Sequence, residues 1–208
     1  MRGDGLLLDL LMAVMNSIEV WQRATPGRST GLEWRDAVTT RMAAAGRYTD
    51  YERIVRNAAA ELRLPADSPD RLFAEWESME PWPDAGTLAD VGVPYAFLTN
   101  CSTRLAEAAA RRSGLGPQFV LSAERSGWFK PAPDAYLEGC RLLGTAADRT
   151  LFVAGSPYDA EGARRAGLDT ILVRRRSDHR PISASTSVVE SLAELPFVGS
   201  RRDGAGTP

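Results

Sequence analysis

The sequence predicts an α/β fold, with a Rossmann-like parallel sheet core and an inserted helical cap subdomain. From about residue 82 to 195, short apolar runs of strand length alternate with segments of helical length, which is the pattern of βαβ units. Before this region, one apolar run at residues 5–8 is followed up to residue 80 by segments of helical periodicity. A strand followed by consecutive helices indicates a helical insertion directly after the first strand of the sheet.

The N-terminal part is expected to hold one strand and four helices. Apolar residues recur at helical spacing after the strand, and turn-forming residues at 25–30 end the first helix. The last helix has Ser68 as its N-cap and Pro69 at its first helical position. The four predicted helices span residues 14–24, 34–46, 51–64 and 68–79.

The C-terminal part is expected to complete the sheet. Its predicted strands span residues 95–98, 119–122, 150–153 and 170–173, and its predicted helices span 105–113, 133–143, 160–166 and 187–195. Glycine directly follows some of these helices, as Gly144 and Gly167 do, and glycine is the usual residue there. The predicted organisation is a core of residues 1–13 and 81–198, a cap of residues 14–80 and a disordered tail of residues 199–208.

Composition limits the classes of function. The formal net charge is −2 and the isoelectric point is near 5.6, so there is no electrostatic basis for binding nucleic acid or a membrane. The basic cluster at residues 174–176 is more simply a solvated strand end than a phosphate site. Two cysteines, Cys101 and Cys140, and no signal peptide indicate a cytoplasmic protein. A single histidine, His179, argues against a Cys–His nucleophile and against a zinc site.

Polar residues at strand ends predict the position of the functional site. Asp9 follows the first strand, Thr99 and Asn100 end the second, and Lys130 and Asp159 lie in or near later loops. The carboxyl ends of parallel strands share one edge of the sheet, where α/β folds bind ligands. These side chains are therefore expected to meet, although Asp9, Thr99 and Asn100 could also act only as helix caps.

The same stretches resemble the motifs of the haloacid dehalogenase superfamily. Asp9 after a strand, Thr99-Asn100 after another, FKPAPDAY around Lys130 and SPYDAEGARRAG around Asp159 match its four motifs. The helical insertion after the first motif is similar to the cap of the 2-haloacid dehalogenases. The resemblance covers about residues 5 to 175.

This resemblance implies a role for each matching residue. Asp9 is the nucleophile, Lys130 the cation that keeps it ionised, and Asp159 the acid that orients the lysine and the hydrolytic water. The Thr99 hydroxyl belongs to the second motif, and the Asn100 amide helps to bind the leaving halide.

Four further positions are implied to contact the substrate. Tyr136 matches a functional tyrosine of the dehalogenases, although a tyrosine on a helix is as often a core residue. Leu11 and Ser156 stand where the dehalogenases carry a tyrosine and an asparagine. A cap arginine binds the substrate carboxylate or the halide, for which Arg41 is the candidate and Arg47 the second choice.

Departures from the superfamily pattern select among its reactions. Phosphatases carry an acid two residues after the nucleophile, where this chain has Leu11, and a second metal-binding acid, where it has Gly155. The remaining carboxylates make a poor Mg²⁺ site. The expected function is therefore metal-independent displacement at carbon on a small-molecule substrate, with no cofactor and with a possible homodimer. The alternatives are an Mg²⁺-dependent phosphatase and a non-catalytic binding protein, since the Gly-Thr expected after Asp9 is replaced by Met12 and Ala13.

Overall fold

Six parallel strands form the centre of the molecule. The computed structural model describes residues 3–26, 28–175 and 186–198, without the side chains of residues 28 and 29. The strand order is β3-β2-β1-β4-β5-β6, and every pairing is parallel. The strands are β1 Gly5–Asp9, β2 Tyr95–Thr99, β3 Val120–Ser122, β4 Thr150–Ala154, β5 Asp169–Val173 and β6 Ser187–Val189. The predicted α/β fold class is confirmed.

Alternation along β1 divides the core into two layers. Leu6 and Leu8 pack into one hydrophobic cluster and Leu7 into the other, because successive side chains of a strand point to opposite faces. The Leu7 face is covered by α7 (Pro133–Leu143) and α8 (Pro157–Arg165). The opposite face packs against α5 (Thr103–Arg112), while the short α6 (Ala123–Ser126) directly follows β3.

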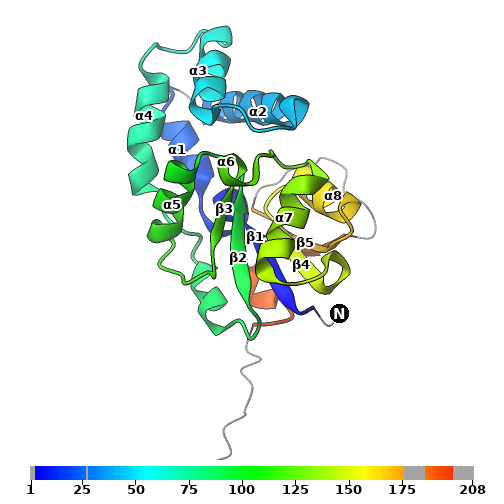
Figure 1. Cartoon of the computed structure of the whole chain (residues 1–208). Helices are drawn as coiled ribbons and strands as arrows, with labels where there is room; N and C mark the ends of the chain where they lie inside the picture. The colour runs from blue at the N-terminus through cyan, green and yellow to red at the C-terminus, as the bar shows by residue number, and fades with distance from the viewer. Residues whose placement is uncertain (1–2, 27, 176–185, 199–208) are drawn as a thin grey trace, which may run out of the picture.

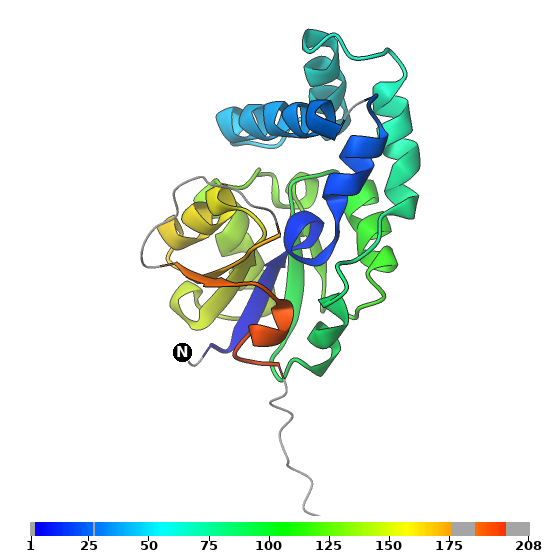
Figure 2. The same cartoon turned by 180° about the vertical axis from the view of Figure 1, so that it is seen from behind.

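Four helices between β1 and β2 form the cap. They are α1 Ser17–Arg23, α2 Arg28–Ala45, α3 Tyr51–Glu61 and α4 Ser68–Glu75. In both views α2 and α3 lie beyond the carboxyl ends of the strands, apart from the layers that flank the sheet (Figures 1 and 2). The chain leaves and re-enters the core at one place, where Met15 and Pro81 form an antiparallel bridge.

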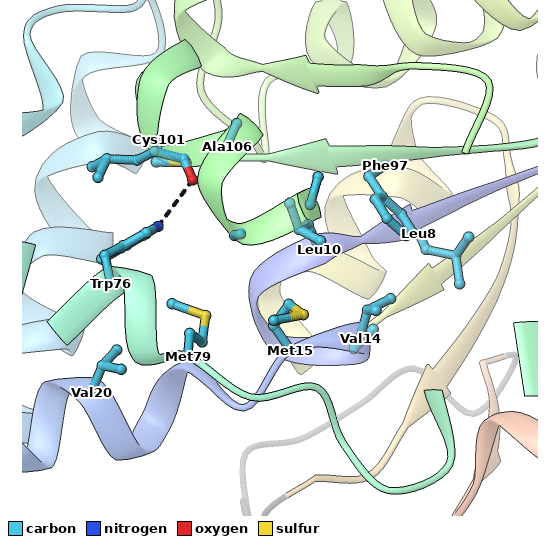
Figure 3. Close-up of a cluster of buried hydrophobic side chains, with 14 of the residues drawn as sticks. Leu8, Leu10, Val14, Met15, Val20, Trp76, Met79, Phe97, Cys101 and Ala106 are labelled. Carbon is cyan, nitrogen blue, oxygen red and sulfur yellow. Dashed lines mark hydrogen bonds between the residues drawn. The ribbon is translucent and has the colours of Figure 1, made fainter. Parts of the chain in front are cut away.

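A buried cluster joins the cap to the core just after the end of β1. Residues Leu10–Val14 form a π-helical turn, and Leu10, Val14 and Met15 are fully buried there (Figure 3). The indole Nε1 of Trp76, which follows α4, donates a hydrogen bond of 3.0 Å to the carbonyl oxygen of Leu105 in α5 (Figure 3). This packing holds the segment that follows Asp9.

Several predicted elements differ from the structure. The predicted helix at 187–195 is wrong: Ser187–Val189 pair with β5 as a strand, and a 3₁₀ turn at Leu192–Glu194 follows. β-branched valines favour the strand, and Ser191 and Glu194 form a capping box that starts the turn. The predicted helix at 14–24 begins only at Ser17, after the π-helical turn. Ser68 is the first residue of α4 and not its N-cap, and the predicted tail lies outside the described residues.

Candidate active site

Lys130 lies between two carboxylates that are far apart in the sequence. Its Nζ donates hydrogen bonds to Oδ1 of Asp9 at 2.9 Å and to Oδ2 of Asp159 at 2.5 Å. The exposed fractions of the three side chains are 3% for Lys130, 8% for Asp9 and 2% for Asp159. Lys130 is also the one lysine in the 208-residue sequence. A buried charge of this kind is stable only when it is paired, as it is here.

The sheet topology brings these groups together. Asp9 ends β1, which lies between β2 and β4, and Asp159 lies in the first turn of α8, directly after β4. Strand β1 is where the order of strands changes direction, and ligands of open α/β sheets bind at such a point. The loop at residues 129–133, FKPAP, places Lys130 at the same edge of the sheet.

Burial and charge shift the pKa values at this centre. Burial lowers the pKa of Lys130, but the charges of Asp159 and Asp9 outweigh that effect, so the pKa lies above its usual value. Burial raises the pKa of Asp159 to about 6, although Lys130 opposes the shift. Asp159 Oδ1 also accepts a hydrogen bond from the Tyr136 hydroxyl, whose own pKa is raised well above its usual value by burial and by the charge of Asp159.

The backbone of Lys130 is also held by side chains. Oδ1 of Asn100 accepts the Lys130 amide hydrogen at 2.7 Å, and Nδ2 of Asn100 donates to the Lys130 carbonyl oxygen at 2.8 Å. The Tyr158 hydroxyl donates to the same carbonyl oxygen and accepts a 3.1 Å hydrogen bond from Asn100 Nδ2. Both amide hydrogens of Asn100 are therefore used inside the protein.

A small cavity with a volume of about 60 Å³ opens onto Asp9 and lies between the cap and the core. An empty cavity of roughly 150 Å³ is enough to bind benzene, so this one suits a substrate of few atoms. Its core side is formed by Asp9, Leu11, Met12, Thr99, Asn100, Lys130, Ser156, Tyr158 and Asp159. Its cap side is formed by Ser17, Trp21, Arg35, Val38, Thr39, Met42 and Tyr51. The cap side is mainly apolar and carries one cation, Arg35.

A second cavity of about 230 Å³ adjoins the first. The two share Arg35, Thr39, Ser156 and Tyr158, and the second continues along α2 past Asp36, Thr40 and Ala43. Six of its seven lining residues carry a polar group, and Ala43 is the exception.

The structure brings together seven of the residues selected from the sequence. Asp9, Leu11, Thr99, Asn100, Lys130, Ser156 and Asp159 all line the small cavity. Tyr136 does not line it. The Tyr136 ring packs between α7 and the sheet, in the cluster that contains Leu7, and its hydroxyl contacts Asp159 from outside the cavity.

The structure places the two arginines expected in the cap elsewhere. Arg41 forms an ion pair with Glu61 of α3 on the outside of the cap. The Arg47 guanidinium stacks over the Trp128 ring, 4.4 Å from its centroid. Neither lines the cavity. A helix turns 100° per residue, so Arg41 lies roughly 120° around α2 from Arg35.

Nine of the sixteen cavity residues were not among the predicted site residues, and two of these nine, Arg35 and Tyr158, matter most for the chemistry of the site. The signal for Arg35 is helical: Val38, Thr39 and Met42 follow it at three, four and seven residues, so all four share one face of α2. The signal for Tyr158 is its position directly before Asp159 at the start of α8.

The residues at this centre fit a magnesium ion poorly. The Lys130 ammonium occupies the space between the Asp9 and Asp159 carboxylates. At Gly155, a side chain has no room, because a Cβ atom there would lie 2.4 Å from the Cβ of Met12. Magnesium needs several hard oxygen ligands in near-octahedral geometry. Within residues 3–26, 28–175 and 186–198, no group of three or more His, Cys, Asp or Glu side chains is placed to hold a metal ion.

Comparison with known proteins places the chain in a family. The family model described as haloacid dehalogenase-like hydrolase matches residues 4–167, most of the chain. The chain belongs to the haloacid dehalogenase-like hydrolases. It is thus a hydrolase by family, and the resemblance read from the four motifs is confirmed. In the described part of this hydrolase, none of the helices has both the length and the apolar character that crossing a membrane requires.

Relatives of this haloacid dehalogenase-like hydrolase differ in their reactions. The (S)-2-haloacid dehalogenase of Xanthobacter autotrophicus is 30% identical over 182 residues, which are 80% of this chain and 72% of that enzyme. Hexitol phosphatase A of Escherichia coli (strain K12) is 33% identical over 109 residues, 52% of this chain and 50% of that enzyme.

Solved structures agree on the fold. The structure of L-2-haloacid dehalogenase from Xanthobacter autotrophicus with chloropropionic acid covalently bound superposes with a TM-score of 0.79 at 24% identity. The match covers 93% of this chain and 96% of that one. The haloacid dehalogenase-like fold, including a helical cap, is therefore shared over nearly the whole length.

Proposed function

We propose that this hydrolase cleaves the carbon–halogen bond of small 2-haloacids through an ester on Asp9, without a metal ion. The observation that carries the proposal is the Asp9 carboxylate, held by Lys130 at one wall of a small cavity, with Arg35 entering from the cap. Its relatives named (S)-2-haloacid dehalogenase support the same reaction.

The first step is displacement at an sp³ carbon. An oxygen of Asp9 attacks C2 of the haloacid, a carbon–oxygen bond forms, and the carbon–halogen bond breaks with its electron pair leaving on the halide. Arg35 is the cation placed to bind the substrate carboxylate or the leaving halide. The mainly apolar walls exclude bulk water, which strengthens these charge interactions.

The second step returns Asp9 to its starting state. A water molecule attacks the carbonyl carbon of the ester and passes one proton to Asp159. The bond between that carbon and the substrate oxygen then breaks, Asp159 returns the proton to the departing oxygen, and a 2-hydroxy acid leaves. The second water proton is released to solvent, which leaves Asp9 as a carboxylate. With a pKa raised to about 6, Asp159 is a suitable proton acceptor near neutral pH. Lys130 then balances the negative charge that develops at Asp9.

Phosphate ester hydrolysis is a weaker candidate, although one relative is a hexitol phosphatase. Position 11, two residues after Asp9, holds an apolar leucine and no acid that could protonate a leaving alcohol. Gly155 leaves no room for a second metal-binding carboxylate. Phosphoryl transfer depends on such charge stabilisation.

Halide release from 2-chloro and 2-bromo acids, with and without EDTA, tests the proposal. We expect release that EDTA does not reduce, that Asp9→Asn abolishes and that Asp148→Asn, an exposed control, leaves unchanged. One turnover in H₂¹⁸O should place ¹⁸O in the peptide that contains Asp9, because water attacks the ester carbonyl. Label in the product alone would refute the ester. Turnover of phosphate esters that requires Mg²⁺, in place of halide release, would refute the reaction.

A further inference from the structure

Lys130 is fixed at both ends. Its ammonium group contacts Asp9 and Asp159, while its backbone amide and carbonyl are bound by Asn100 and Tyr158. A lysine side chain has four carbon–carbon torsions and a point charge, so its ammonium position depends on how well its backbone is anchored. Lys130 belongs to neither a helix nor a strand, and its backbone amide and carbonyl form their hydrogen bonds with the side chains of Asn100 and Tyr158.

We propose that Tyr158 is a positioning residue, whose hydroxyl, together with the Asn100 amide, anchors the Lys130 backbone so that its ammonium stays between Asp9 and Asp159. The proposal rests on the proposed function, because it concerns the same catalytic lysine. It also gives Asn100 a different task from halide binding. Both Asn100 amide hydrogens and the Tyr158 hydroxyl hydrogen are already donated within the protein.

The place of Tyr158 in the chain and the protonation of its hydroxyl both suit it to anchor the Lys130 backbone. The tyrosine lines both cavities, and it is the residue before Asp159, so one short segment supplies an anchor for the lysine backbone and a partner for the lysine ammonium. Burial, and then the charge of Asp159, raises the pKa of the Tyr158 hydroxyl. The hydroxyl therefore keeps its proton and remains a donor to the Lys130 carbonyl.

Tyr158→Phe is the direct test, because it removes the hydroxyl and keeps the ring that lines the cavity. Under the proposal, kcat for halide release falls by about tenfold or more, since a misplaced catalytic group is costly even when the displacement is small. KM and inhibition by added chloride or bromide stay within twofold. Tyr95→Phe, at the opposite end of β2, is the matched control and leaves kcat unchanged.

Unchanged kcat in Tyr158→Phe would overturn the proposal. A raised KM or weaker halide inhibition with unchanged kcat would also overturn it, because the hydroxyl would then act on the substrate or the halide directly.

A second readout does not depend on turnover. Lys130 is the one lysine in the sequence, so in protein grown with ¹³C,¹⁵N-lysine all labelled side-chain resonances come from this residue and need no assignment. In Tyr158→Phe we expect the two Hε resonances to move toward a common shift and the pH midpoint of the signal to fall, while Tyr95→Phe matches the wild type. If the wild type releases no halide, the lysine signal still decides this proposal. A spectrum and titration identical to the wild type in Tyr158→Phe would overturn it.

Discussion

The loop after Asp9 lies directly against Gly155. A Cβ atom added at Gly155 would lie 2.4 Å from the Cβ of Met12 and 2.5 Å from the backbone nitrogen of Ala13, distances that real Cβ atoms essentially never show. Part of this contact is with backbone, which cannot rotate away. Any side chain at position 155 would therefore push on the turn that directly follows Asp9, the proposed nucleophile.

Gly155→Ala should lower both stability and activity. Overpacking at such a contact costs about 1–3 kcal/mol in the free energy of unfolding. Because the displaced turn directly follows Asp9, kcat should fall while the enzyme is still fully folded. Gly116→Ala is the matched control, since its added methyl would meet nothing within 4 Å. Urea unfolding measures the change in stability, and halide release measures the change in kcat. If Gly155→Ala changed both values no more than Gly116→Ala does, the turn after Asp9 would have to move aside at little cost, which would contradict the prediction.

Replacing Arg35 should lower kcat/KM far more than replacing Arg41, although both residues lie in α2. Arg35→Met removes the cation that lines the cavity, and loss of a charged hydrogen bond to a substrate carboxylate or halide costs about 1.5–3 kcal/mol, or roughly tenfold to a hundredfold in kcat/KM. Arg41→Met removes a surface ion pair with Glu61 and should change kcat/KM by less than about twofold. Steady-state kinetics on 2-chloropropionate compares them, and the opposite order would return the substrate-binding role to Arg41.

The rate of ester hydrolysis, followed in a single turnover, should show an acid limb near pH 6. The pKa of Asp159 is raised to about 6, so protonation removes the proton acceptor as the pH falls through that value, and the rate drops by about tenfold per pH unit. The Tyr136 hydroxyl donates to Asp159 and favours its charged form. Tyr136→Phe should therefore move the limb to higher pH. A limb that moves to lower pH, or does not move, would contradict this contact.

Removing Lys130 should destabilise the protein in a pH-dependent way. Lys130→Met leaves two buried carboxylates without their cation, and breaking a buried pair costs about 3–5 kcal/mol. The folded-state pKa of Lys130 is raised, so its contribution is present at neutral pH and is lost only as the pH rises through that value. The raised pKa of Asp159 lets this carboxyl protonate below about pH 6, so the loss should be smaller at pH 5 than at pH 8. Urea unfolding at the two pH values checks this; equal losses would mean that Asp159 stays charged at pH 5.

Strand ends are the part of the site that could be predicted most directly. Asp9 and Thr99 end buried apolar runs, and parallel strands place such ends on one edge of the sheet, so their meeting follows from local patterns. Lys130 and Asp159 were found through motifs around them, and they lie at the same edge. Their catalytic roles are part of the proposed function.

The α/β class, the helical insertion after β1 and the position of Asp9 could be predicted from the sequence, because periodicity and strand ends are local properties. Lys130 and Asp159 could be predicted from the motifs that contain them. Three features are visible only in the folded chain: Arg35 and not Arg41 lines the cavity, the Tyr136 hydroxyl contacts Asp159 from outside the cavity, and Met12 leaves no room for a side chain at Gly155. These are relations between segments far apart in the chain. Periodicity identifies the faces of a helix but not which face meets which neighbour, and that choice depends on how the cap packs over the sheet.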